Sequence, residues 1–333
     1  MYVSLRSLLI PFLVFFAPSL GISCLAEPVD SDRKVVLHLQ WLPQAQFAGY
    51  LVAAEKGFYR EAGLSNVVID SRAAAGPFQA LLASECDFCC AWLPLAIRER
   101  SRGGELVELV QLFQDSSLAF IAHKESGIKS LSDLQGRRCQ IWKSDVGDLP
   151  RLILKQSRVE PEIVPLTVSQ SLFLRKIVPA QVVTLHNEYN GILEAGVRPE
   201  ELVVITAKDC GFDYPEDGLF CRTETRKQEP ELCAAFAEAS LRGWVYALEP
   251  RNEAEVLDII VARAHTARNI TNRNHQRWML RKVREHVTHR VGDDPAAWGK
   301  LSPEAYRKTV DMLRNAGEIT EAVPYENFYR GNF

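Results

Sequence analysis

The sequence predicts an α/β fold with two lobes, each a mainly parallel sheet covered by helices. Apolar strand-like runs alternate with helical periodicity, first at VVLHLQ (35–40), VVID (67–70), DFCCAW (87–92) and ELVELVQLF (105–113). A second alternating series follows residue 124, and 333 residues exceed the usual size of one domain. Such alternation is typical of parallel sheets with helices on both faces.

The connections predict where each lobe begins and ends. A helix after Pro43 ends at Gly57, and Ser130 is expected to cap the short helix LSDLQ. Residues 116–124 look extended and suit a passage between lobes, and the chain is expected to return to the first lobe near Gly218. We therefore predict lobe 1 from 33–120 plus 215–333 and lobe 2 from 121–214. The ligand site of such a clamshell is the cleft at the carboxyl ends of the strands.

The first 26 residues have the composition of a secretory signal peptide. Arg6 precedes an apolar run at 8–20, and small residues lead to a cleavage position after Ala26. The run is short for a membrane span, which needs about 20 residues. We expect segment 1–26 to direct export to the periplasm. Lipid attachment at Cys24 stays open as an alternative.

Charge and cysteines narrow the function classes. With 39 basic and 42 acidic residues the formal net charge is −3, which gives no electrostatic reason to expect a nucleic acid partner. Export permits disulfides, and Cys210 and Cys221 bracket the turn-rich loop GFDYPEDGLF, so we predict a disulfide between them. Cys86, Cys89 and Cys90 lie in or beside an apolar strand and are interpreted as small buried residues.

Several motifs over residues 34–285 together resemble one protein family. They are W-x-P-x-x-x-x-x-G followed by A-x-E-K-G-F-Y-x-x-A-G-L, then ALLASECDFCCAWLP, LSDLQGRRCQIW and HNEYNGILEAG. The chain is similar to the thiamine-precursor-binding (SsuA/THI5-like) family of periplasmic solute-binding proteins of ABC importers. The resemblance implies a type II periplasmic-binding fold and a small ligand such as an aminopyrimidine, riboflavin or a related heterocycle or amine. It also implies an ABC permease as partner, no cofactor, and a monomer.

The same resemblance suggests contacts from the first lobe. Trp41 is expected to stack on a flat heterocycle, while Gln44 and Gln46 offer amide hydrogen bonds near a helix start. The alternatives are a core Trp41 and solvated glutamines. Phe47 stands where some relatives have histidine, which is a departure from the thiamine-pyrimidine pattern.

Asn187 and Glu188 are the next candidates, and both follow a predicted strand of the second lobe. In pyrimidine-binding relatives the matching carboxylate accepts hydrogen bonds from the ring and its amine, which is a charge-assisted pair. The alternatives are a glutamate that only favours the helix start and an Asn187 that only caps the helix.

Further candidates follow other strands or lie in a loop. They are Trp92 and Pro94 as an opposite wall, with Trp92 in the core as the alternative, Ser144 and Asp145 before a helix, and Tyr214 in the GFDYPEDG loop.

An enzyme of this fold is not expected. A pyrimidine-synthase branch uses a cofactor-binding lysine and a histidine, but the matching positions hold Ala91 and Leu95, so no Schiff base can form. A ligand sensor that reports to a membrane signalling protein remains the rival to transport. His275, His286 and His289 lie among arginines and are interpreted as a solvated basic helix face.

Overall fold

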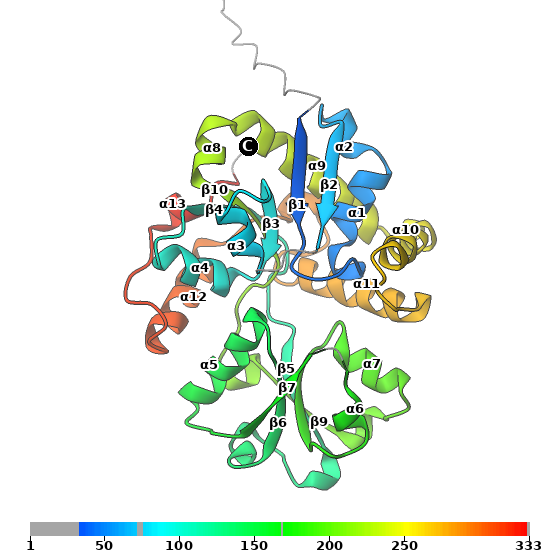
Figure 1. Ribbon diagram of the computed structural model, residues 1–333, viewed down its shortest axis with the longest axis vertical. Helices are drawn as coiled ribbons and strands as arrows, with labels where there is room; N and C mark the ends of the chain where they lie inside the picture. Colours follow the sequence, from blue (N-terminus) through cyan, green and yellow to red (C-terminus); the bar gives the residue numbers. More distant parts are fainter. Residues whose placement is uncertain (1–32, 72–75, 168, 332–333) are drawn as a thin grey trace, which may run out of the picture.

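The computed structural model describes residues 33–71, 76–167 and 169–331. The predicted signal peptide 1–26, with Cys24, lies outside the described residues. Figure 1 shows two lobes, one above the other, each built around its own sheet. The predicted α/β clamshell is therefore confirmed.

The first lobe contains a five-stranded sheet in the order β2-β1-β3-β10-β4. Its strands are β1 (Lys34–His38), β2 (Asn66–Asp70), β3 (Phe88–Ala91), β4 (Leu106–Gln111) and β10 (Gly218–Arg222). Strand β1 runs parallel to β2 and β3, whereas β10 runs antiparallel to β3 and β4.

The second lobe repeats this arrangement in the order β7-β6-β8-β5-β9. Its strands are β5 (Leu118–His123), β6 (Arg138–Trp142), β7 (Glu162–Leu166), β8 (Ala180–Thr184) and β9 (Leu202–Thr206). Here β6 is parallel to β7 and β8, and β5 is antiparallel to β8 and β9.

In each sheet the antiparallel strand is the one that enters from the other lobe. The chain crosses from β4 to β5 through residues 112–117 and from β9 to β10 through residues 207–217. Residues 116 and 117 belong to the first crossing, and Leu118–His123 are extended as expected. The expectation that 118–123 also form the passage is wrong, because this segment is a fully buried strand inside the second sheet.

Helices cover both sheets (Figure 1). In the first lobe they are η1 (Ala45–Phe47), α1 (Ala48–Glu55), α2 (Phe58–Glu61), α3 (Pro77–Leu82), α4 (Leu93–Ser101), α8 (Thr223–Gln228), α9 (Pro230–Leu248), η7 (Pro250–Asn252), α10 (Glu253–Thr266), α11 (Arg273–Thr288), η8 (Pro295–Ala297), α12 (Pro303–Asn315) and α13 (Tyr325–Phe328). In the second they are η2 (Lys124–Ser126), η3 (Leu131–Leu134), η4 (Asp145–Gly147), α5 (Asp148–Gln156), α6 (Ser171–Leu174), α7 (Glu188–Glu194), η5 (Pro199–Glu201) and η6 (Lys208–Cys210).

Local signals of the sequence set several of these boundaries. Gly57 follows α1 with a φ of 78°, which is the left-handed conformation that glycine adopts without steric cost. Ser130 caps η3 in a capping box, in which the Asp133 carboxylate accepts the Ser130 backbone N–H at 2.9 Å. In the described part of the chain, no helix has both the length and the apolar character needed to cross a membrane.

Helices α1 and α9 pack closely in the first lobe because Gly49 and Gly243 lie in their interface. A Cβ atom at Gly243 would clash with the Gly49 carbonyl oxygen and lie 2.8 Å from the Ala53 Cβ. A Cβ at Gly49 would overlap the buried Trp244 ring, whose centroid is 5.6 Å from the Tyr50 ring. Neither position leaves room for a methyl group.

The substitution Gly243→Ala is expected to lower the free energy of unfolding by about 2 kcal/mol, since an overpacked core must move backbone apart. Gly191→Ala in α7 is the control, because its new methyl would lie 3.7 Å from Gln170 in ordinary contact. That control should gain about 0.5 kcal/mol from helix propensity. Urea unfolding of both variants measures the difference, and equal stabilities would contradict the close packing.

Candidate functional site

A cavity of about 160 Å³ lies between the two lobes, and we call it the interlobe cavity. It is lined by Trp41, Gln44, Trp142, Leu166, Thr167, Gln170, Asn187, Glu188, Asn269, Ile270, Thr271, His275 and Gln276. The second lobe contributes residues that follow or end β6, β7 and β8, and the first contributes residues after β1 and around the start of α11. This is the carboxyl edge of parallel strands, where open α/β sheets bind ligands.

Two indole rings line the interlobe cavity from opposite lobes. Trp41 follows β1 and is 41% exposed, which is unusual for so large an apolar side chain. Trp142 ends β6 and is only 7% exposed. Aromatic faces of this kind can stack on a flat ring. Trp142 was not among the predicted contacts, although it ends a strand, which is the same signal that predicted Trp92.

Glu188 lies at the same cavity, at the first position of α7. One carboxylate oxygen accepts hydrogen bonds from the Thr184 backbone N–H at 2.9 Å and from the Thr184 hydroxyl at 2.7 Å. Burial raises the pKa of this carboxyl, and the bonds from Thr184 and the Trp142 side chain oppose that rise. The hydrogen bonds fix the carboxyl at the cavity, where it can accept from a ligand N–H.

His275 connects the lobes at the rim of the cavity. Its Nε2 bonds the Asn187 Oδ1 at 3.0 Å, and its Nδ1 bonds the Asn190 Nδ2 at 2.9 Å. Burial lowers the pKa of His275, and a neutral ring with its proton on Nε2 satisfies both amides. Asn187 thus bonds a side chain across the lobes and makes no side-chain cap bond to its helix.

The interpretation of these histidines as a solvated basic face is wrong for two of them. His275 lines the cavity, and His286 is buried with its Nδ1 2.7 Å from an Asp115 oxygen. The neighbouring arginines do point outward, as Arg273 and Arg281 pair with Asp258 and Glu253. A single helix here carries a solvated side and a buried polar side.

The two predicted glutamines form a chain that leads inward from the cavity. Gln44 lines the cavity, and its Nε2 donates to the Gln46 Oε1 at 2.8 Å. The Gln46 Nε2 in turn donates to the Asp217 Oδ2 at 2.8 Å. Both glutamines are buried, so the solvated alternative is wrong, but only Gln44 lies at the cavity. Burial raises the pKa of Asp217 to about 6, and the bond from Gln46 opposes this rise.

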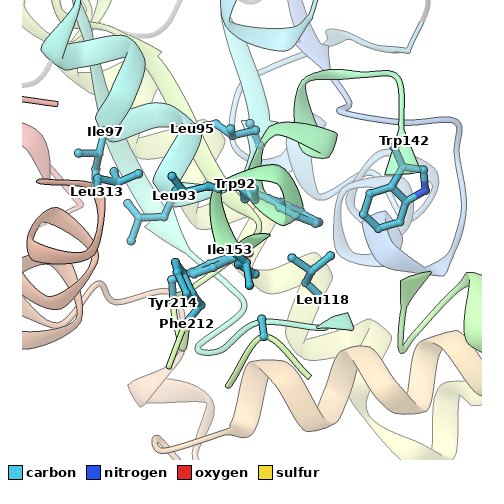
Figure 2. Close-up of a cluster of buried hydrophobic side chains, with 14 of the residues drawn as sticks. Trp92, Leu93, Leu95, Ile97, Leu118, Trp142, Ile153, Phe212, Tyr214 and Leu313 are labelled. Carbon is cyan, nitrogen blue, oxygen red and sulfur yellow. The ribbon is translucent and has the colours of Figure 1, made fainter. Parts of the chain in front are cut away.

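Other predicted contacts do not lie at the cavity. Figure 2 shows Trp92 and Tyr214 within a cluster of buried side chains that also contains Leu118 and Ile153 of the second lobe. Trp92 is 2% exposed and Pro94 is buried beside it, so packing between the lobes already covers this expected wall.

Of the two residues predicted in the loop after β6, Ser144 is not among the described residues that line the cavity. Ser144 is exposed, while of Asp145 only the backbone, at the first position of η4, is described. The side chain of Asp145 lies outside the described part of the structure.

The predicted Cys210–Cys221 disulfide is not present. Both thiols are free, with Cys210 half-buried after β9 of the second lobe and Cys221 buried in β10 of the first. The loop between them is the crossing from one lobe to the other, so it does not close as a hairpin. The Cys221 sulfur instead lies 3.9 Å from the Cys233 sulfur.

A larger open hollow of about 560 Å³ lies in the second lobe at the amino ends of β6 and β7, opposite to the strand ends that face the interlobe cavity. Its charged side chains pair with one another, for example Lys176 with Glu125 at 2.8 Å and Arg138 with Glu162 at 3.6 Å. The interlobe cavity is the stronger candidate, because an aromatic ring from each lobe and the Glu188 carboxyl converge there.

Comparisons with known proteins agree with this architecture. The riboflavin-binding protein RibY of Chloroflexus aurantiacus is 25% identical over 317 residues, which cover 90% of this chain and 86% of the relative. The alkanesulfonate-binding protein SsuA of Xanthomonas axonopodis pv. citri, solved bound to MOPS, superposes with a TM-score of 0.64 at 14% identity. That match covers 89% of this chain and 98% of SsuA.

The same fold also occurs in an enzyme. The desulfurization enzyme DSZB matches with a TM-score of 0.56 at 14% identity, over 90% of this chain and 97% of its own. A family model described as NMT1/THI5 like matches residues 44–254, which is more than half of the chain. The protein therefore belongs to the NMT1/THI5-like family, with the fold of the solute-binding components of ABC import systems.

Proposed function

We propose that this protein captures a small flat heterocycle or amine between its lobes and delivers it to an ABC permease. The observation that carries the proposal is the interlobe cavity itself, where Trp41 and Trp142 offer aromatic faces and Glu188 offers a carboxyl. Among the described lining residues none is a lysine or arginine, and burial keeps His275 neutral. Such a cavity favours a neutral or cationic hydrogen-bond donor over an anion such as a sulfonate.

The size of the cavity favours a ligand with one ring. Its volume of about 160 Å³ is well below the roughly 300 Å³ at which pockets for drug-sized ligands begin. A single aminopyrimidine ring therefore suits it better than the three fused rings of riboflavin. An aminopyrimidine also carries the N–H donors that the Glu188 carboxyl can accept.

The fold also supports the proposed mode of action. A clamshell closes over its ligand by hinge motion, and the two crossings at 112–117 and 207–217 are the segments about which its lobes can turn. We infer a monomer that works in the periplasm without a cofactor and without catalysis, as expected for a solute-binding component.

Native mass spectrometry of the gently purified protein tests the proposal, because a retained ligand appears as added mass. Thermal-shift measurements with an aminopyrimidine, riboflavin, a polyamine and an alkanesulfonate then identify its class. We expect stabilisation by the aminopyrimidine and none by the alkanesulfonate. Stabilisation by the alkanesulfonate alone would overturn the proposed class.

The substitution Trp41→Ala is expected to weaken aminopyrimidine binding about fivefold, since stacking on an aromatic ring is worth about 1 kcal/mol. The folded state should lose little stability, because this side chain is already 41% exposed without ligand. Ile177→Ala removes another exposed apolar side chain, which is 42% exposed in the second lobe, and should leave binding unchanged. Isothermal titration calorimetry measures the affinity of each variant. Equal affinities of both variants would show that Trp41 does not contact the ligand.

A further inference from the structure

Two buried thiols face each other between a strand and the helix that covers it. Cys221 in β10 and Cys233 in α9 are both fully buried, and their sulfur atoms lie 3.9 Å apart. We propose that Cys221 and Cys233 form a disulfide when the protein folds in an oxidising compartment. A disulfide bond is about 2.05 Å long, so side-chain rotation must bring the sulfurs about 2 Å closer.

The sheet register selects this pair from the other cysteines. In the antiparallel pairing of β10 with β3, Cys221 lies opposite Phe88, whereas Phe220 lies opposite Cys89. Directly opposite residues share a face of the sheet, so Cys89 points to the face away from α9. Cys90 is on the same face as Cys221 but lies opposite Leu219. Cys221 therefore contacts Cys233, which is carried by the helix that covers this face of the sheet.

The reaction is an exchange with a small disulfide oxidant, for which oxidised glutathione serves as the probe. The thiolate of one cysteine attacks a sulfur of the oxidant and releases one glutathione thiolate, which leaves a mixed disulfide on the protein. The second cysteine loses its proton to solvent and displaces the other glutathione. Two protein thiols are oxidised while the oxidant is reduced to two glutathione molecules. Because both sulfurs are buried, the exchange takes place before α9 packs against β10.

The pairing is independent of the proposed ligand. Neither cysteine lines the interlobe cavity, and both belong to the first lobe. The bond would fasten α9 to the strand that follows the second crossing, without restricting movement of the second lobe. Ligand binding and disulfide formation can therefore fail separately.

Refolding the full chain with oxidised and reduced glutathione, followed by alkylation in denaturant, which exposes both cysteines, and by peptide mass mapping, tests the proposal. We expect a linked peptide pair that contains Cys221 and Cys233, and at least a roughly tenfold fall in their alkylation relative to fully reducing conditions. Cys139→Ser, in the second lobe, is the control and should keep the link. Cys221→Ser should abolish it.

Two results would overturn the proposal. One is full alkylation of both cysteines in oxidatively refolded protein, and the other is a link from Cys221 to a different partner such as Cys89. Both are read from the unsubstituted chain, so a variant that fails to fold does not weaken the test.

Discussion

The substitution Glu188→Gln is expected to weaken the binding of an aminopyrimidine about a hundredfold. A hydrogen bond to a charged group contributes about 1.5–3 kcal/mol, and the upper end applies where partners are shielded from water. The amide oxygen of glutamine can still accept the Thr184 N–H that now bonds the carboxylate at 2.9 Å. The fold should therefore survive while the affinity falls. Titration calorimetry gives the affinity, and urea unfolding confirms the stability.

Glu200→Gln is the matched control for this experiment. Glu200 is an exposed glutamate of the second lobe in η5, and its carboxylate pairs with Arg198 at 3.4 Å. The same loss of charge at that position should leave binding unchanged. If Glu188→Gln bound the aminopyrimidine as tightly as the control, the carboxyl would have only its structural bond to Thr184 and no role in recognition.

The fold could be predicted because buried parallel strands leave a clear trace in the sequence. Runs such as DFCCAW are apolar on both faces of a sheet, and helical periodicity separates them. LAFIAH at 118–123 has the same character, but its extended look was interpreted as a passage between the lobes. Its place between β8 and β9 depends on pairing with strands far along the chain. Such pairing is not a local property of the sequence.

The site could be predicted only in part for a related reason. The rule that ligands meet the carboxyl ends of strands located Trp41 and Glu188, and the structure brings both to one cavity. The same rule selected Trp92, which side chains of the opposite lobe cover. Applied to β6, the rule selected Ser144 and Asp145 in the loop that follows the strand, but not Trp142 at the end of the strand itself. His275 was missed because its arginine neighbours dominate the charge pattern of α11, and the sequence does not show which side of that helix meets the other lobe.

A buried carboxyl joins the two crossings between the lobes. Glu216 in the second crossing accepts the hydroxyl of Ser116 at 2.7 Å and that of Ser117 at 2.6 Å, and both serines belong to the first crossing. Burial raises the pKa of Glu216 to about 7, and the two serine hydroxyls oppose the rise. His286 favours the charged form of Glu216, whereas the neighbouring Asp217 opposes it.

The free energy of unfolding is therefore expected to fall as the pH rises from 4.5 to about 7. From an ordinary value of 4.5 to about 7, the folded protein keeps a proton on Glu216 that the unfolded chain has released. Each pH unit between these values is worth about 1.4 kcal/mol, so the carboxyl costs about 3 kcal/mol above pH 7. Asp217, whose pKa burial raises to about 6, changes stability in the same direction.

His286 also makes the protein less stable as the pH rises, although its charged form is a cation. Burial alone would lower its pKa, but the hydrogen bond and charge of Asp115 and the charge of Glu216 raise it overall. The stabilisation from protonated His286 is complete below the unfolded pKa of 6.5 and is lost as the pH rises through the raised folded value. All three groups thus favour the folded state at lower pH.

The substitution Glu216→Gln should remove the largest part of this trend. The amide is neutral at every pH and can still hydrogen-bond the two serine hydroxyls. Relative to the unsubstituted protein, the variant should gain about 3 kcal/mol between about pH 4.5 and pH 8, and urea unfolding across that range measures the gain. The exposed Glu160→Gln is the control and should follow the unsubstituted protein. If the stability of Glu216→Gln changed with pH as that of the unsubstituted protein does, Glu216 would be ionised in the folded protein over this pH range. Between about pH 4.5 and pH 8, only a proton retained on folding makes the two stability profiles diverge.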